Sequence, residues 1–142
     1  MNKKLAIVAG LFVALVCPGV VCPGLFAQQI VAMHANIPFD FRMGDKLLPA
    51  GTYLIQASDR ALVLREEGGR LMAASLLTIP ESQSAPPATG ELWFHRYGSD
   101  YFLASVWTPY SRDGQSLPKT KQERQLARLS GGVVQTAAIH LK

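Results

Sequence analysis

The stretch from Glu91 to Trp107, ELWFHRYGSDYFLASVW, decides the fold that this sequence predicts. Two runs rich in aromatic and other apolar residues flank Gly98-Ser99, a pair suited to a tight turn between antiparallel strands. With the turn at these residues, His95 faces Phe102 across the strands and has Asp100 as its diagonal neighbour. The stretch therefore predicts a β-hairpin.

Both faces of the predicted hairpin carry aromatic residues, whereas a half-exposed hairpin has one polar face. Under this pairing, Leu92, Phe94, Tyr101, Leu103 and Trp107 share one face. The pattern favours a central hairpin covered on both sides, with a helix and its loop as the second cover. The alternative is an exposed face whose rings stack on sugars or apolar ligands. The candidate ligand-binding residues, on the other face, are Trp93, His95, Tyr97 and Phe102.

The rest of the chain predicts further strands and one helix. Residues 31–41 alternate with period two, which indicates a half-buried strand that lies at an edge or bends at Pro38. Other strands are expected near residues 52–57, 61–66, 71–79 and 133–141, and the stretches 80–90 and 108–116 are expected to be loops. In residues 120–132, Thr120 and Glu123 fit a helix capping box, and Gly131 ends the helix.

These elements predict a mainly β fold. About seven strands with frequent turn signals, and one helix before the last strand, are typical of a small antiparallel β-sandwich or an open barrel. The 142 residues leave room for a single domain, expected at residues 28–142.

Residues 1–27 have the layout of a secretory signal peptide. Lys3 and Lys4 form a basic start, an uncharged apolar run follows, and a segment of small residues broken by Pro and Gly ends at Ala27. Cleavage after Ala27 fits best, with cleavage after Gly24 and retention as an anchor as alternatives. Under all three, the domain is exported to the periplasm or beyond, and after cleavage it has no stable membrane insertion.

Cysteine and charge narrow the function classes. Cys17 and Cys22 are the only cysteines and both lie in the leader, so the domain has no disulfide or thiol chemistry. The formal charge of +4 includes Lys3 and Lys4, and the remaining basic residues are spread along the chain, which gives no nucleic-acid signal.

Three segments resemble a family of small exported bacterial proteins with β-rich folds and no established activity. The segments are IPFDFRMGDKLLPAGTYLI, FHRYGSDYFLASVW and LPKTKQERQLA. They match the patterns IPFxF…GxxxLPAGxY, FxRYGxxYFLxxVW and LPKxxxER in the same order over most of the domain. The resemblance implies export and a single β-rich domain, and it transfers no site residue.

No local motif predicts catalysis, a metal site or a cofactor. A serine hydrolase needs a hydroxyl, an imidazole and an acid together, but the pairing points Ser105 away from His95. The three histidines lack ligand spacing. A basic stripe of Lys121, Arg124 and Arg128 fits a solvated helix face. We therefore expect a non-enzymatic binding or structural module of the cell envelope, in contact with an envelope protein or a glycan. The alternatives are a small hydrolase using His95, or a carrier of an apolar or sugar ligand on the hairpin.

Overall fold

The computed structural model describes residues 30–68, 71–75 and 77–142, which form eleven strands and one helix. The predicted signal peptide and both cysteines lie outside these residues. The first six strands are β1 (Val31–Ile37), β2 (Phe41–Met43), β3 (Lys46–Leu48), β4 (Gly51–Ser58), β5 (Ala61–Glu66) and β6 (Leu71–Ser75). They are followed by β7 (Ile79–Ser82), β8 (Glu91–Tyr97), β9 (Asp100–Trp107), β10 (Asp113–Ser116), α1 (Lys121–Leu129) and β11 (Gln135–His140).

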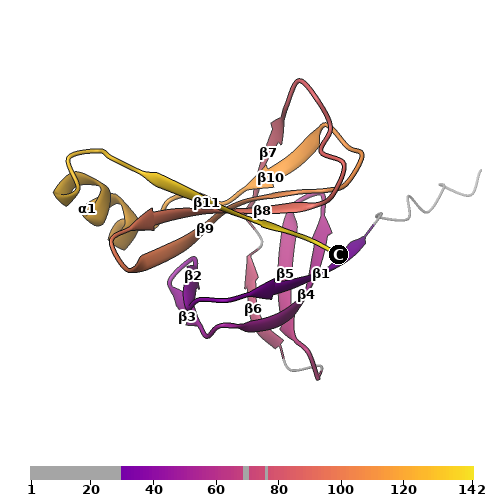
Figure 1. Ribbon diagram of the computed structural model, residues 1–142, viewed down its shortest axis with the longest axis horizontal. Helices are drawn as coiled ribbons and strands as arrows, with labels where there is room; N and C mark the ends of the chain where they lie inside the picture. The colour runs from indigo at the N-terminus through magenta and orange to yellow at the C-terminus, as the bar shows by residue number, and fades with distance from the viewer. Residues whose placement is uncertain (1–29, 69–70, 76) are drawn as a thin grey trace, which may run out of the picture.

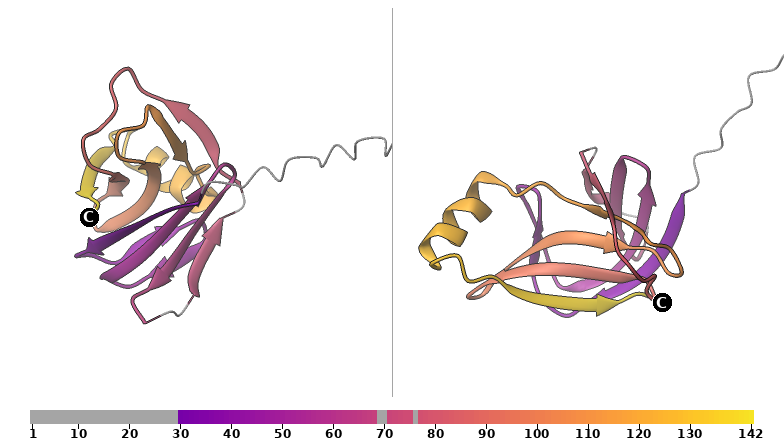
Figure 2. Two further views of the ribbon diagram at one scale, coloured as in Figure 1. Left: turned by 90° about the vertical axis from the view of Figure 1, so that its right-hand side faces the viewer. Right: turned by 90° about the horizontal axis from the view of Figure 1, so that it is seen from above.

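The strands form two sheets that face each other (Figures 1 and 2). One sheet has the order β1-β4-β5-β6, and the other has the order β11-β8-β9-β10-β7, with β2 pairing with β3 and, in parallel, with β9. Neither sheet closes into a barrel in the part of the chain that the structure describes. The predicted mainly β fold with one helix before the last strand is confirmed, and its sandwich form is the one observed.

The core lies between the two sheets. The alternating residues of β1 that point inward, Met33, Ala35 and Ile37, are buried as their period-two pattern predicts. They pack with Tyr53, Ile55, Leu62 and Leu64 from one sheet and Leu92, Phe94, Leu103 and Val106 from the other. Burying each of these aliphatic side chains contributes about 1.5–3 kcal/mol. The central hairpin thus supplies one wall of the core.

The backbone joins the sheets along one side. The amide and carbonyl of His34 in β1 exchange hydrogen bonds with Lys142, and the amide of Leu141 donates to the carbonyl of Gly90. The segment after β11 therefore runs between an edge strand of one sheet and the start of β8 in the other.

Two segments expected as loops contain strands. Residues 79–82 form β7 and residues 113–116 form β10, and the two strands pair with each other in antiparallel fashion. The four residues of β7 are all exposed, because this strand is the edge of its sheet. An edge strand tolerates Pro80 and polar residues, so its composition resembles that of a loop.

A β-bulge corrects the predicted faces of the hairpin. The turn at Gly98, with φ 62°, and the pairing of His95 with Phe102 are confirmed. Beyond them, however, Phe94 pairs with Leu103 and Trp93 pairs with Ser105, so Ala104 is an extra residue in β9. An extra residue moves the following side chains to the other face. Ser105 and Trp107 therefore share the face of Trp93, and the prediction that they lie opposite was wrong.

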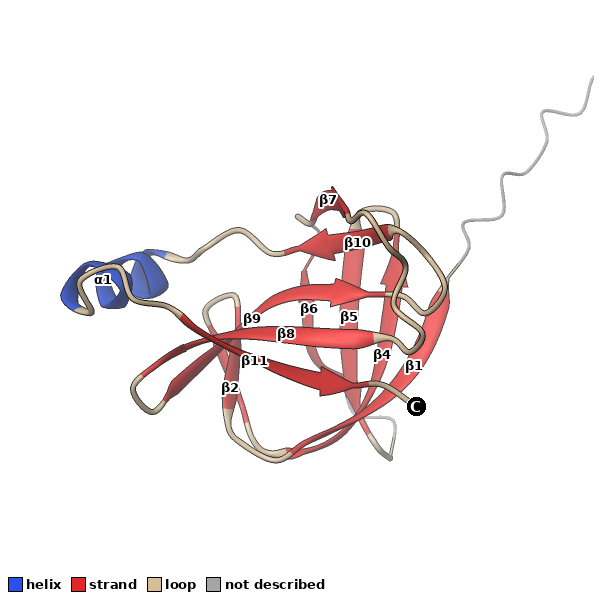
Figure 3. Ribbon diagram, turned by 45° about the horizontal axis from the view of Figure 1, so that its top comes forward, coloured by secondary structure: helices blue, strands red, loops and turns tan. Residues whose placement is uncertain are grey.

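Helix α1 lies at one end of the molecule, beside the turn between β8 and β9 (Figures 1 and 3). Its predicted start is confirmed, since the amide of Glu123 donates to Oγ1 of Thr120 at 3.1 Å. We expected the helix to cover the hairpin with an apolar face, and this was wrong: Leu126 is half-buried, Leu129 is 77% exposed, and the buried residue is Glu123. No helix among the described residues is long and apolar enough to span a membrane.

Candidate functional site

The outer face of strands β11, β8 and β9 is the face turned away from the core. Leu92 and Phe94 of β8 point into the core, so their neighbours along the strand point outward. Strand pairing places residues of β9 and β11 on the same face, because partners in an antiparallel pair point the same way. The outer face consists of Glu91, Trp93, His95, Tyr97, Asp100, Phe102, Ser105, Trp107, Thr136, Ala138 and His140.

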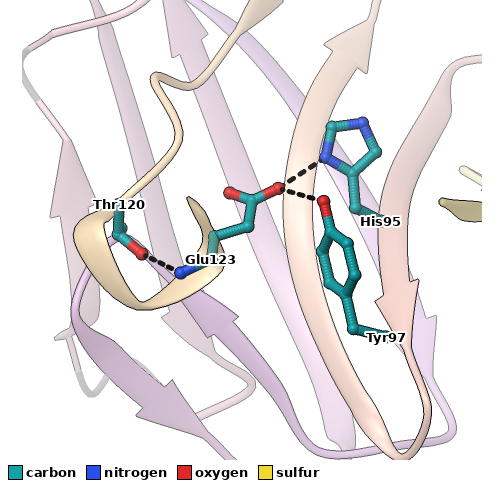
Figure 4. A network of polar contacts seen from close by, with 4 residues as sticks. All are labelled: His95, Tyr97, Thr120 and Glu123. Carbon is teal, nitrogen blue, oxygen red and sulfur yellow. Dashed lines mark hydrogen bonds and ion pairs between the residues drawn. The ribbon is translucent and has the colours of Figure 1, made fainter. Parts of the chain in front are cut away.

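One end of this face holds a buried carboxylate with two partners, His95 and Tyr97, which together with Glu123 we name the Glu123 cluster (Figure 4). Oε1 of Glu123 lies 2.7 Å from Nδ1 of His95 and accepts a bond of 3.4 Å from the Tyr97 hydroxyl. The Glu123 side chain is 6% exposed and the His95 side chain 27%. Since an ionised carboxylate only accepts hydrogen bonds, Nδ1 of His95 carries the proton.

The environment of Tyr97 is apolar and negatively charged. Its ring meets the ring of Phe102 edge-on at 5.9 Å. Burial raises the pKa of the Tyr97 phenol, and the nearby charge of Glu123 and their hydrogen bond raise the pKa further. The phenol is therefore a neutral donor that helps to satisfy a buried carboxylate.

The other end of the outer face is open around Trp93, which is 38% exposed. Its indole Nε1 donates to Oε2 of Glu91 at 2.8 Å, and Nδ1 of His140 lies 3.7 Å from Oε1 of the same carboxylate. We name Glu91, Trp93 and His140 the Trp93 cluster. The strand partners of Trp93 are the small residues Ser105 and Ala138, so no large side chain stands directly opposite Trp93 on either neighbouring strand.

Trp107 lies on the same face but is 8% exposed. Its Nε1 donates to the Ser105 hydroxyl at 3.2 Å, and the ring lies flat against Gly114 of β10. A Cβ atom at Gly114 would stand 2.3 Å from the ring, so only glycine permits this approach.

The structure separates the four predicted ligand residues. Tyr97 and Phe102 are 5% and 2% exposed, so they belong to the packing beneath α1 and are closed to a ligand. Trp93 is accessible, and His95 is partly so. The expectation that both faces of the hairpin are covered therefore fails at Trp93, because α1 reaches only the end near Tyr97.

Sequence reasoning missed three residues of the two clusters. Glu123 was assigned only to the local capping box, although its side chain bonds 28 residues away. Glu91 and His140 come together by pairing of β8 with β11, which no local motif shows. The signal for Glu91 was its position two residues before Trp93, which places both on one face of a strand.

The His95 and Glu123 pair resembles half of a hydrolase triad, with an acid on Nδ1 of the histidine. The bulge brings Ser105 to the face of His95, but the Ser105 hydroxyl is bonded by Trp107. Among the described residues, no hydroxyl bonds to His95. At the other end, Thr89 and Glu91 both approach Nδ1 of His140, whereas a relay uses both ring nitrogens.

Metal-ligand geometry is also absent from the described part of the chain. No three His, Cys, Asp or Glu side chains there lie close enough to hold an ion. The outer face thus offers an aromatic ring with polar neighbours. That arrangement suits non-covalent recognition.

Comparison of the chain with protein-family models, with curated proteins and with solved structures gives no match.

Proposed function

We propose that this protein is an exported, non-enzymatic binding module of the cell envelope and that the Trp93 cluster binds glycan. The observation that supports this most directly is the exposed, oriented indole of Trp93 between two small strand partners. A ring of this kind offers a large apolar surface with a polar edge. Sugar rings have apolar faces that stack on such a surface.

The polar groups around Trp93 support the same ligand class. The Glu91 carboxylate is 21% exposed, and the His140 side chain is 71% exposed, so both meet solvent beside the indole. A carboxylate accepts hydrogen bonds from sugar hydroxyls, and an imidazole either donates or accepts. The bond from Trp93 to Glu91 fixes the ring, which reduces the entropy cost of binding.

Sedimentation with purified insoluble cell-wall glycan tests the proposed ligand. We expect the protein to sediment with the glycan and Trp93→Ala to lose most of this binding. The matched control is Tyr110→Ala, which removes an aromatic side chain that is 82% exposed in the loop after β9. Equal binding by wild type and Trp93→Ala, or equal loss in both variants, would refute the proposed site.

Intact mass of the exported protein tests the leader. We expect a chain that begins at Gln28, because cleavage after Ala27 fits the segment best. Such a chain contains no cysteine, so a reductant leaves its melting temperature unchanged. A membrane-bound species that retains residues 1–27 would contradict cleavage. It would not decide whether the Trp93 cluster binds glycan, because the sedimentation assay tests that separately.

A further inference from the structure

We propose a second binding site, a cavity of about 580 Å³ that takes a small organic amine. The cavity lies where the end of β4 and the following turn approach β10 and the loop between β9 and β10. It is lined by Val106, which points into the core side of β9, so it lies on the opposite side of the sheet from Trp93. Its volume lies within the usual range for small-molecule sites, about 300–1,000 Å³. This site is independent of the glycan proposal.

The side-chain donors of the lining are largely used within the protein. The Ser58 hydroxyl donates to the carbonyl of Ala61, and the Thr108 hydroxyl donates to the carbonyl of Asp113. The amide nitrogen of Gln115 donates to the carbonyl of Ser58. A ligand that needs to accept hydrogen bonds therefore finds few groups to donate them.

The acceptors of the lining, in contrast, have spare capacity. The carboxylate of Asp59 has no side-chain partner among the described residues, and that of Asp113 accepts one bond, of 3.3 Å, from the Ser82 hydroxyl. Among the described residues, Oε1 of Gln115 is buried and has no hydrogen-bond partner. Since a carboxylate can accept several bonds, these groups complement a ligand that donates.

Charge points to the same conclusion. Two lining residues are acidic and none is basic, although the chain as a whole has a formal charge of +4. Arg60 and Arg112 are sequence neighbours of the two aspartates, but neither lines the cavity. Within the described residues, neither aspartate forms an ion pair, as the ion pairs there are those of His95 and His140. The cavity is therefore a local anionic site.

The apolar residues of the lining indicate what else the ligand must carry besides a positive charge. Val31, Ala57 and Val106 contribute apolar surface to the same cavity as the two carboxylates. A ligand that fits both parts has an ammonium group, which only donates hydrogen bonds, on a short apolar body. A bare metal ion is a poorer match, because no group of three acidic or histidine ligands occurs among the described residues.

Isothermal titration with cadaverine, a five-carbon diamine, tests this site in the folded full domain. We expect saturable binding that weakens about tenfold or more in Asp59→Asn and in Asp113→Asn, because each variant removes a charge-assisted acceptor. The control is Asp45→Asn, which removes an exposed carboxylate in the turn between β2 and β3 and leaves the affinity unchanged. Pentanediol and glutarate, which match the chain length without the positive charge, are expected not to bind.

Three results would overturn the proposal. Wild-type protein that binds no cadaverine lacks the site, and equal weakening in all three variants shows attraction to surface charge only. Pentanediol that binds as tightly as cadaverine shows that the charge has no role. Both aspartates of the cavity are exposed, so we expect Asp59→Asn and Asp113→Asn to have the melting temperature of the wild type. This measurement shows that the variants remain folded. Trp93→Ala retains cadaverine binding, which separates this site from the glycan site.

Discussion

The Glu123 cluster and the Trp93 cluster lie at the two ends of the outer face of β8, yet one is buried and the other is open. In both, a carboxylate accepts a hydrogen bond from a ring of β8. Glu123 comes from a helix 28 residues beyond His95, whereas Glu91 lies two residues before Trp93 on the same strand. The long-range pair joins two elements of the fold. The short-range pair only orients a side chain, which is what a binding surface needs.

Glu123→Ala is expected to give the largest effect on this comparison. The change removes two hydrogen bonds to a charged, buried group, and we expect the free energy of unfolding to fall by about 2–3 kcal/mol. Chemical denaturation measures it. The matched change Glu91→Ala removes a more exposed carboxylate from the other end of the face and is expected to cost less than about 1 kcal/mol. Equal costs would show that the two clusters do not differ in structural role.

Leu126→Ala tests whether α1 is held by its polar contact or by apolar packing. Full burial would make this change cost about 2–5 kcal/mol. Because Leu126 is half-buried, we expect about 1 kcal/mol, less than for Glu123→Ala. The same denaturation experiment decides the order. A larger loss of unfolding free energy for Leu126→Ala than for Glu123→Ala would show that apolar packing, and not the polar contact, holds α1 in place.

Iodide quenching of tryptophan emission measures the openness of the Trp93 cluster. In Trp107→Phe, the remaining Trp93 is expected to be quenched readily, because 38% of it is exposed. In Trp93→Phe, the remaining Trp107 is expected to be shielded against Gly114. Glycan that binds at the cluster protects Trp93 from iodide. Equal quenching in the two variants would contradict the difference between the two indoles.

Alkaline pH is expected to have the smallest effect, at the Glu123 cluster. The folded protein raises the pKa of Tyr97 above its ordinary value of about 10. Above that pH the unfolded chain loses the proton first, so the contribution of Tyr97 to stability falls as the pH rises towards the pKa of the folded state, and this contribution is fully present below pH 10. We expect the melting temperature of Tyr97→Phe to fall less than that of the wild type as the pH rises above 10.

Tyr53→Phe is the comparison for that experiment. Burial, followed by the charges of Glu66 and Asp40, also raises the pKa of Tyr53, which lies in the core. Tyr53→Phe is therefore expected to remove a separate part of the fall in melting temperature at alkaline pH. An unchanged decline in Tyr97→Phe would show that the Glu123 cluster does not hold this phenol in its neutral form.

Local patterns predicted much of the fold. The alternation in β1, the turn at Gly98 and the start of α1 at Thr120 each follow from residues close in sequence, and each is observed. Strands β7 and β10 could not be predicted in this way, since their pairing partner rather than their composition makes them strands.

The candidate site was predicted only in part for the same reason. Trp93 could be found because it belongs to an aromatic run. The partners of that run come from distant elements: Glu123 contributes a side chain from the helix, and His140 arrives through the pairing of β11 with β8. The extra residue Ala104 also has no glycine or other local signal, so the face of Trp107 could not be read from the hairpin alone.

That extra residue makes β9 tolerant of a change in length at this point, because no residue of β8 pairs with it. The carbonyl of Ala104 accepts a bond of 2.8 Å from the amide of Leu117, so the backbone of the extra residue is bonded to the residue that follows β10. Replacing Ala104 by another small residue preserves this arrangement. Deleting it would make Ser105 follow Leu103 directly, so these residues would pair with Trp93 and Phe94 in regular register, with Val106 still in the core and Trp107 still on the outer face. A one-residue gap here therefore leaves both the fold and the outer surface of the domain in place.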